Sequence, residues 1–315
     1  MSADSLVTLI VAAYRTRPEH LRAALASALA QTHAELEIIV SDDSPDHRLG
    51  ALVAAFADPR LHYQHHPQAL GAAQNHARCL QQARGSFVAI LNHDDALAPE
   101  FVARTRAALR RHPSAVLAFC DHHVVDADGR PQTAQSDRVS ARWGRAVLAS
   151  GLHRPFTSLV VAQSIPMAMG TLIRRTAVPH APPRCAGPAY DLWLSYLLAR
   201  HGGGAVYLPE RLSAWRDHAG SLTHQGGLDW LRGAALCWEA MADDAAFTGQ
   251  RALLCSRVAA AWVACARAAW RQGRVADSRR YAARSLQTRF TARGVAALGL
   301  SLWPAPAATR LAGTR

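Results

Sequence analysis

The sequence predicts an α/β fold in which a mostly parallel sheet is flanked by helices and followed by a helical extension. Between residues 6 and 121, short apolar runs alternate with amphipathic stretches of helical period. Continuous apolar runs of this length are typical of strands buried on both faces of a parallel sheet. Beyond residue 226 the chain becomes alanine-rich with helical spacing throughout. We therefore expect a sheet domain over residues 1–225 and a helical region over residues 226–315.

The first half of the expected sheet domain is the most regular part. Pro18 and Pro99 stand where helices begin, a position that needs no backbone N–H, and Gly85 is a typical helix stop. The alternation of strands and helices predicts right-handed connections. We expect strands at residues 6–12, 36–40, 61–64, 87–91 and 115–120, and helices at residues 18–29, 48–57, 71–84 and 99–111.

The second half is less regular. Residues 126–187 contain a turn signal at Asp128-Gly129 and only a weak helical pattern at residues 142–151. A strand is expected near residues 164–173, a helix at residues 190–199, and strands at residues 205–208 and 213–221. Helices then follow at residues 230–241, 250–271 and 276–286. For the tail, residues 294–315, we expect a loosely ordered end, with an amphipathic segment lying on the surface as the alternative. The last two helices resemble one tetratricopeptide-type pair, which needs a partner surface on this chain or on a second copy.

Candidate site residues follow three of the expected strands. Because the carboxyl ends of parallel strands meet at one edge of a sheet, these residues should line one cleft. Adjacent carboxylates repel each other unless a cation lies beside them, and hard divalent cations prefer such oxygens. A helix cap explains one of the adjacent acids Asp94 and Asp95 but not both, so we favour a metal site at these two residues. The strand-end residues are Ala13 and Tyr14, Asp42 and Asp43, and Asn92, His93, Asp94 and Asp95.

Composition limits the classes of function without selecting one. The net charge is +12, and every basic residue is arginine. Arginine pairs bidentately with phosphate and carboxylate, which suits an anionic substrate or a membrane surface; a GC-rich genome explains the same bias. The six cysteines form no Cys-x-x-Cys pair, so a zinc knuckle or redox motif is not indicated.

Targeting and cofactor motifs are equally sparse. We find no secretory signal and no run of about 18 apolar residues, so we expect a cytoplasmic protein, with the inner membrane face as an option. No Gly-x-Gly-x-x-Gly follows the first strand, and no Walker motif is present. These absences disfavour a dinucleotide cofactor and a P-loop.

Six segments in order resemble motifs of the family-2 glycosyltransferases of the GT-A fold. The resemblance covers residues 6–223. The segments are LIVAAYR from Leu9, QTH from Gln31 with LEIIVSDDS from Leu36, LGAAQN from Leu70, GSFVAILNHDD from Gly85, YDLWL from Tyr190 and WRDH from Trp215.

The resemblance implies a Rossmann-like GT-A domain with a nucleotide-sugar half at residues 1–121 and an acceptor half at residues 122–225. It implies inverting transfer of a sugar from a nucleotide diphosphate donor, with a UDP-sugar favoured, to a glycan, a lipid-linked or another hydroxyl acceptor. Mn²⁺ or Mg²⁺ is the implied cofactor. The implied nucleotide-binding residues are Ala13, Tyr14, Asp42, Asp43, Gly71, Asn75 and His93, and the implied metal-site residues are Asp94, Asp95 and His218.

Individual roles also follow from the resemblance. Asp42 would accept a hydrogen bond from the base, with a loop cap as the alternative, and Asp94 would hold the cation at the diphosphate. His218 would reach the diphosphate or the metal, with a hydrogen-bonded structural histidine as the alternative. Asp191 would be the general base that takes the acceptor's proton; a helix-capping role is the alternative. The chain departs from the family pattern at Asn92, where an aspartate is usual, and at Gln74 and Ala189.

Other classes of function stay open. A nucleotidyltransferase that makes sugar nucleotides would need a glycine-rich loop after the first strand, and residues 12–17 contain no glycine. A non-catalytic nucleotide-sugar-binding subunit is compatible with Asn92 and Ala189. Nucleic-acid binding is not expected, because the arginines form no block and no binding module. Peripheral membrane contact and a homo-oligomer through the C-terminal helices are further expectations.

Overall fold

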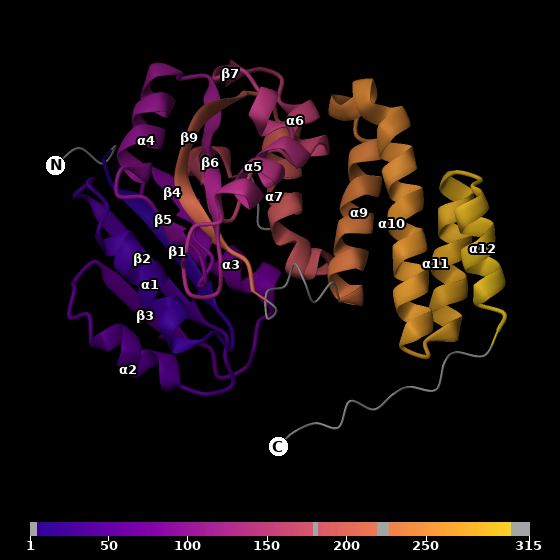
Figure 1. The fold of residues 1–315 in the computed structure, drawn as a ribbon, viewed down its shortest axis with the longest axis horizontal. Helices are drawn as coiled ribbons and strands as arrows, with labels where there is room; N and C mark the ends of the chain where they lie inside the picture. The colour runs from indigo at the N-terminus through magenta and orange to yellow at the C-terminus, as the bar shows by residue number, and fades with distance from the viewer. Residues whose placement is uncertain (1–4, 179–181, 219–226, 304–315) are drawn as a thin grey trace. The chain divides into compact units, whose positions relative to one another are not determined.

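The computed structural model describes residues 5–178, 182–218 and 227–303. The chain forms two compact units, which we call the sheet unit (Met1–Arg184 with Tyr190–His224) and the helical unit (Cys185–Ala189 with Gln225–Arg315). Figure 1 labels their helices and strands.

The first half of the sheet unit follows the sequence prediction closely. Its strands pair in parallel in the order β3-β2-β1-β4. They are β1 (Val7–Ala13), β2 (Leu36–Asp42), β3 (Leu61–His65) and β4 (Phe87–Ile90). The connecting helices are α1 (Pro18–Leu29), α2 (Arg48–Ala54), α3 (Ala72–Gln82) and α4 (Phe101–Arg111). The α/β fold predicted from the alternation of apolar runs is thus confirmed.

The second half makes the sheet mixed. Among the described residues, β8 (Thr171–Arg174) enters antiparallel between β4 and β6 (Ala115–Val125). β9 (Gly204–Arg216) pairs in parallel with β6, and β5 (Ala96–Leu97) and β7 (Gly151–His153) pair antiparallel with β9. The expected parallel order therefore holds for the first four strands. An apolar run does not reveal the direction of its neighbours, which is why β8 could not be oriented from sequence.

Several boundaries in this half differ from the prediction. The strand expected to stop at residue 120 continues to Val125, so Asp121 lies inside β6, where the pairing with β9 is irregular. The two late strands are one, β9. The helix expected at residues 142–151 was wrong: α5 (Thr133–Arg142) ends there, and the short η1 (Arg145–Val147) follows. Three shorter helices, α6 (Thr157–Val161), η2 (Arg175–Ala177) and η3 (Arg184–Ala189), precede α7 (Tyr190–Arg200).

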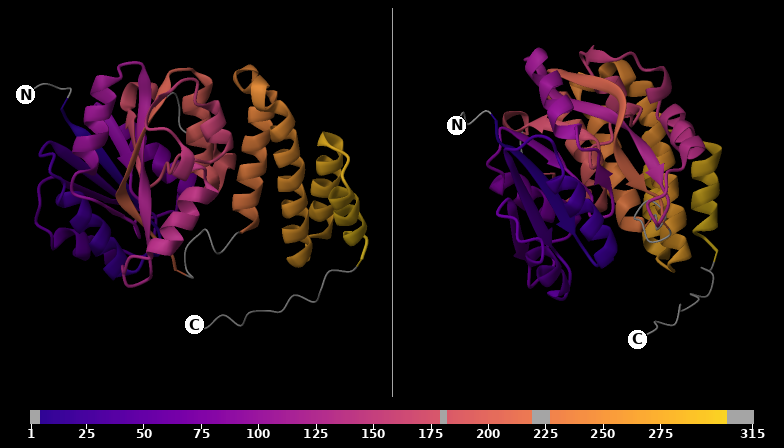
Figure 2. Two further views of the ribbon diagram at one scale, coloured as in Figure 1. Left: turned by 45° about the horizontal axis from the view of Figure 1, so that its top comes forward. Right: turned by 60° about the vertical axis from the view of Figure 1, so that its left-hand side comes forward.

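The core of the sheet unit lies between the sheet and the helices on one of its faces. Alternate residues of β1, such as Leu9 and Val11, belong to one buried apolar cluster with Leu25 of α1, Leu49 of α2 and Phe101 of α4. The other face of β1 packs on α3, which also contacts α7. Figure 2 shows the helices that flank the sheet in two further views. This packing leaves the carboxyl ends of β1, β2 and β4 at one edge.

The helical unit contains α9 (Leu228–Asp243), the short η4 (Ala245–Gln250), α10 (Arg251–Arg271), α11 (Val275–Thr288) and α12 (Ala292–Leu300). α10 packs on α9 and α11, and α12 packs on α10 and α11. The three expected helices are confirmed. The expectation of a loose tail from residue 294 was wrong as far as Leu300, because α12 is a packed helix; residues 304–315 lie outside the described residues.

Within the described part of the chain, one helical stretch, Ala245–Arg271, is long and apolar enough by length and composition to cross a membrane. No unbroken apolar run marks this stretch in the sequence, because arginines interrupt it. In the structure 44% of its most apolar window is buried within the protein. Length and composition alone are weak evidence for a membrane span.

Candidate active site

The ends of β1 and β2 lie level with each other. Ala13 pairs with Asp42, and the Asp43 N–H donates to the Ala13 carbonyl at 2.9 Å. The Asp42 side chain is fully buried, and its carboxylate accepts hydrogen bonds from the Ser44 N–H at 2.9 Å and the Tyr63 hydroxyl at 2.8 Å. Burial, followed by this carboxylate, raises the pKa of Tyr63. Both oxygens of the Asp42 carboxylate thus accept hydrogen bonds from the protein itself.

Asp43 fixes the loop that precedes α3. Its two carboxylate oxygens accept the N–H groups of Leu70 and Gly71 at 2.7 and 2.8 Å. Gly71 has a positive φ of 81°, and a Cβ there would meet no atom within 4 Å, so its surroundings are open. Conformation rather than crowding therefore favours glycine at this position.

Asn75 ties α3 to β2. Its amide oxygen accepts the Ser41 hydroxyl at 2.6 Å, and its amide nitrogen donates to the Ser41 carbonyl at 3.2 Å. The predicted nucleotide-binding Asn75 therefore has both polar atoms within the protein. We infer a structural role for it in place of a ligand contact.

Tyr14 is the most accessible of the predicted nucleotide-binding side chains, with 49% of its surface exposed. The Arg15 guanidinium lies over its ring, 5.3 Å from the centroid. Arg15 itself has a positive φ of 47°, and its N–H donates to the Ser44 hydroxyl at 2.8 Å. This loop presents an exposed aromatic ring and a cation beside the strand ends.

Asp94 stands between two histidines at the end of β4. Its Oδ2 lies 3.0 Å from Nε2 of His218, and its Oδ1 lies 4.0 Å from Nδ1 of His93. That His93 nitrogen is buried and has no hydrogen-bond partner among the described residues. Burial lowers the pKa of His93, which favours the neutral ring that a metal requires. The structure thus brings together three predicted site residues from segments far apart in sequence.

Asp95 differs from its neighbour. It is buried, with one oxygen accepting the Arg216 N–H at 2.9 Å and the other accepting the Asn92 amide at 3.0 Å. Burial, and then the charge of Asp94, raises its pKa. In place of the predicted metal contact we infer a structural role, in which Asp95 joins the end of β9 to the loop after β4.

Two residues of this region escaped the sequence analysis. Arg216 donates to the Asp94 carbonyl at 2.8 Å and reaches the Ala127 carbonyl at 3.1 Å, so it joins the Asp94 loop to the turn after β6. His20 of α1 lies edge-on to His218, with 5.0 Å between ring centroids. Burial, then Arg216, lowers the pKa of His20. The WRDH segment contains Arg216, but no motif marks His20.

Tyr190 connects the Asp94 loop to α7. Its hydroxyl donates to the Asn92 amide oxygen at 3.1 Å, and its ring stacks on His76 of α3 with 3.7 Å between centroids. Burial lowers the pKa of His76 to about 4, so the ring is neutral at physiological pH and its Nδ1–H donates to the Ala72 carbonyl at 2.8 Å. Asn92, which departs from the family pattern, is thus a link between two elements.

Asp191 follows Tyr190 in the first turn of α7. Its Oδ1 accepts the Leu192 N–H at 2.8 Å, which is the cap-like contact considered from sequence. The side chain remains partly exposed. Burial raises its pKa, the direction expected for a carboxylate that accepts a proton at mild pH.

The residues at the end of β4 fit a divalent cation only in part. Asp94 offers a carboxylate and His218 an imidazole, a donor pair compatible with Mn²⁺. Among the described residues, no cluster of three histidine, cysteine or acidic side chains is arranged to hold a metal ion. A cation bound at Asp94 would therefore take further oxygen ligands from a substrate, as Mg²⁺ and Mn²⁺ do with diphosphates.

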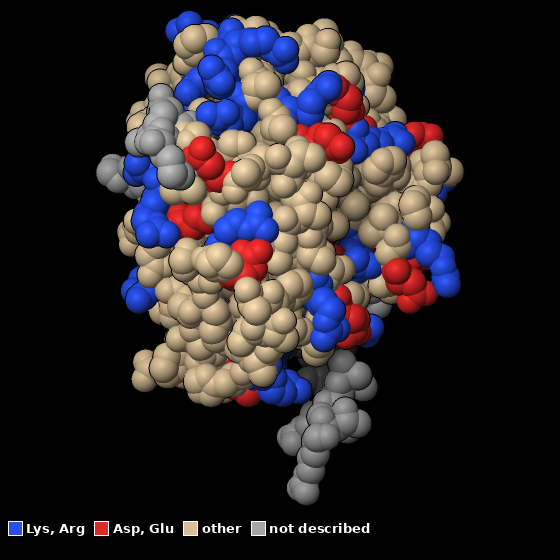
Figure 3. Space-filling view, turned by 90° about the vertical axis from the view of Figure 1, so that its left-hand side faces the viewer, with Lys and Arg blue, Asp and Glu red and all other residues tan. Residues whose placement is uncertain are grey.

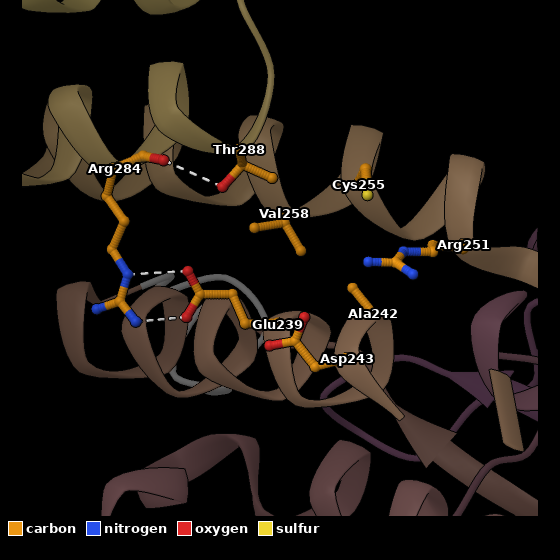
Figure 4. A pocket seen from close by; sticks show the side chains of 8 residues that line it. All are labelled: Glu239, Ala242, Asp243, Arg251, Cys255, Val258, Arg284 and Thr288. Atoms are coloured by element: carbon orange, nitrogen blue, oxygen red, sulfur yellow. Dashed lines mark hydrogen bonds and ion pairs between the residues drawn. The ribbon is translucent and has the colours of Figure 1, made fainter. Parts of the chain in front are cut away.

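A surface pocket of about 260 Å³ lies within the helical unit (Figure 4). Its lining includes Glu239 and Arg284, which pair with each other at 2.5 Å. These two charges thus neutralise each other. The Asp94–His218 pair, with Asp191 directly after the Tyr190 that binds Asn92, is the stronger indication of chemistry, and we place the candidate active site there.

The carboxylates at the ends of the parallel strands lie where open α/β sheets bind their ligands, and sequence comparison identifies the class of protein. The model of the family described as "Glycosyl transferase family 2" matches residues 8–173. The chain belongs to this family.

Two solved structures show the same fold. TarS residues 1–349 from S. aureus, in complex with UDP-GlcNAc, has a TM-score of 0.63 and 15% identity over 93% of this chain and 89% of that one. The mannosyltransferase PcManGT from Pyrobaculum calidifontis, in complex with GDP-Man and Mn²⁺, has a TM-score of 0.57 and 17% identity over 94% and 87%. At such identities the likeness establishes the GT-A fold.

Among curated proteins, succinoglycan biosynthesis protein ExoO of Rhizobium meliloti (strain 1021) is 34% identical over 138 residues, which is 43% of this chain and 38% of that protein. The chain thus spans well under half the length of this relative.

Proposed function

We propose that the protein is an inverting glycosyltransferase that moves a sugar from a nucleotide diphosphate donor to a hydroxyl acceptor, with metal assistance and Asp191 as general base. One observation carries the proposal. The Tyr190 hydroxyl binds Asn92, two residues before Asp94, and Asp191 follows Tyr190 directly. The element that carries the base is therefore linked to the loop that would bind the diphosphate.

The strand-end loops provide the donor side. Tyr14 offers an exposed ring on which a base can stack, and the open surroundings of Gly71 would let a ligand approach the backbone. We favour a UDP-sugar. In support of a nucleotide-sugar donor, TarS has the same fold in complex with UDP-GlcNAc, and PcManGT has it in complex with GDP-Man and Mn²⁺. Functionally, residues 1–121 would form the nucleotide-sugar half and residues 122–225 the acceptor half.

Asp94 and His218 would hold the cation, Mn²⁺ or Mg²⁺. When bound, it would neutralise negative charge on the departing diphosphate. Nδ1 of His93, which has no hydrogen-bond partner among the described residues, would face the negative charge of the same diphosphate.

Asp191 would act on the acceptor. Its carboxylate takes the proton from the acceptor hydroxyl as that oxygen bonds to the anomeric carbon, and the bond from that carbon to the diphosphate oxygen breaks. One displacement from the side opposite the leaving group inverts the anomeric centre. We also propose that the acceptor is a glycan or a lipid-linked molecule.

The decisive variant is Asp191→Asn, which keeps the shape and the cap but cannot take a proton. We expect donor affinity within about twofold of wild type and transfer reduced by about 100-fold or more. Asp229→Asn, at an exposed acid in the first turn of α9, is the matched control and should keep full transfer. NMR of the product should show the anomeric configuration opposite to that of the donor.

A non-catalytic nucleotide-sugar-binding subunit is the second candidate, because Asn92 replaces a carboxylate of the family motif. Donor binding by the wild type without transfer to any of a panel of acceptors would favour it. Transfer that persists within a few-fold in Asp191→Asn would instead leave Asp191 as a cap only.

A further inference from the structure

The positive charge of the chain is concentrated at the C-terminal side of the helical unit. Residues 251–303 contain ten arginines and one acidic residue, Asp277, so they carry +9 of the chain's net +12. Residues 1–250 are nearly balanced, with 23 arginines and 22 acidic residues. On the face in Figure 3, acidic side chains accordingly lie beside many of the basic ones, although basic residues gather along its upper edge.

The same segment exposes large apolar side chains. Phe290 is 81% exposed, Val295 46%, Leu302 67% and Trp303 71%. They lie just before α12, on it and just after it. We call residues 289–303 the α12 face. Isolated exposed apolar residues are ordinary, but four within 14 positions of one short helix and its ends form a patch.

Packing holds α12 so that these side chains point away from the unit. Gly294 and Ala297 are buried against the neighbouring helices, and a Cβ on Gly294 would lie only 2.7 Å from Leu286 of α11. Two hydrogen bonds hold the end of α12. Nε of Arg279 donates to the Ser301 carbonyl at 3.2 Å, and the indole of Trp270 donates to the Trp303 carbonyl at 3.4 Å. The exposed side chains are therefore presented by an ordered element.

Arginines border the apolar residues. Arg289 contacts the Ser256 hydroxyl beside Phe290, Arg293 is exposed on α12, and Arg279 reaches its end. No acidic residue occurs between residues 278 and 303. Exposed aromatic and aliphatic groups bordered by arginine are what a helix needs to lie in the interface of an anionic bilayer.

We propose that the α12 face docks the protein on an anionic lipid surface. Charge complementarity selects this occupant. A second copy would bring the arginines of two α12 faces together, with no acidic residue on either face to offset them. A nucleic acid would gain little from exposed Phe290, Val295 and Leu302. The inference does not depend on sugar transfer, although a lipid surface is where a lipid-linked acceptor would be met.

The test is flotation of the full-length protein with vesicles of phosphatidylcholine alone or mixed with phosphatidylglycerol. We expect binding to the mixed vesicles, weak binding to the neutral ones, and release at about 0.5 M salt, where charge is screened. Phe290→Ser with Trp303→Ser, and separately Arg289→Gln with Arg293→Gln, should each lower partitioning about tenfold or more.

Matched controls remove equivalent groups from the sheet unit. Val147→Ser removes a side chain whose residue is 90% exposed, and Arg48→Gln with Arg130→Gln removes two exposed charges. These variants should partition as the wild type does, and circular dichroism should show unchanged helix content in all of them.

Three results would overturn the proposal. The first is equal partitioning of the α12-face variants and the wild type. The second is binding to a DNA duplex or polyphosphate without binding to vesicles. The third is extraction from vesicles by detergent but not by salt, which would point to insertion of Ala245–Arg271.

Discussion

At the scale of single residues, Asp191 and Asp94 differ in how the fold holds them. The Asp191 carboxylate accepts the Leu192 N–H and has a raised pKa, whereas Asp94 lies between two imidazoles. Sequence motifs located both acids. They could not distinguish Asp94 from Asp95, because the distinction lies in the Arg216 N–H, which arrives from a strand about 120 positions away.

The raised pKa of Asp191 predicts the acid side of the pH–rate profile. Only the ionised carboxylate can take the acceptor's proton, so transfer should fall as the pH falls through the folded-state pKa, which lies above the ordinary value of 3.8. In the same window the ionised group makes the folded protein less stable as the pH rises, because the unfolded chain ionises at lower pH. Transfer measured against pH should show an acid limb above that value. A flat profile down to pH 4 would contradict this role.

Substitution of Asp42 tests the predicted contact between this residue and the base of the nucleotide. Asp42→Ala leaves the Tyr63 hydroxyl and the Ser44 N–H without their partner, so we expect a loss of about 1–3 kcal/mol in the free energy of unfolding. If Asp42 also contacts the base, calorimetry should show a nucleotide affinity about tenfold to a hundredfold weaker. Tyr63→Phe is the control, since it removes one of these bonds and keeps the carboxylate. Affinity within twofold of wild type in Asp42→Ala would make the residue purely structural.

At the scale of elements, the sequence predicted those whose pattern is local. The strands of the first half, and helices such as α3 and α4, follow from apolar period and from Pro and Gly positions. The sequence could not predict β5, β7 or α6, because these elements contain two to five residues and depend on partners distant in the chain. The length of β9 was missed because Pro209 interrupts its apolar pattern.

The link between α7 and the Asp94 loop is an element-scale prediction. Tyr190→Phe keeps the stacking on His76 but removes the hydrogen bond to Asn92. We expect kcat to fall about tenfold, since a small displacement of the base from its reacting position is costly, while the KM for donor changes little. Tyr207→Phe is the control, because that buried hydroxyl donates only to the Arg145 carbonyl. Equal kcat in both variants would show that Tyr190 does not position the base.

At the scale of the whole molecule, the two units divide the properties of the chain. The sheet unit has 18 of the 23 acidic residues and the candidate active site, and the helical unit has most of the net charge. Composition gave the total charge and the alanine-rich texture. It could not show that α12 is an ordered helix with an exposed apolar side, because that follows from the packing of Gly294 on α11.

The most direct test of the account is calorimetry of UDP and GDP binding, with and without Mn²⁺, to the wild type and to Asp94→Ala. The wild type should bind at least one of them more tightly with Mn²⁺, and the variant should lose that enhancement because the cation has lost its carboxylate. Asp46→Ala, at an exposed acid of the same half, should behave as the wild type. Mn²⁺ enhancement that is unchanged in Asp94→Ala would contradict the placement of the donor site at the end of β4.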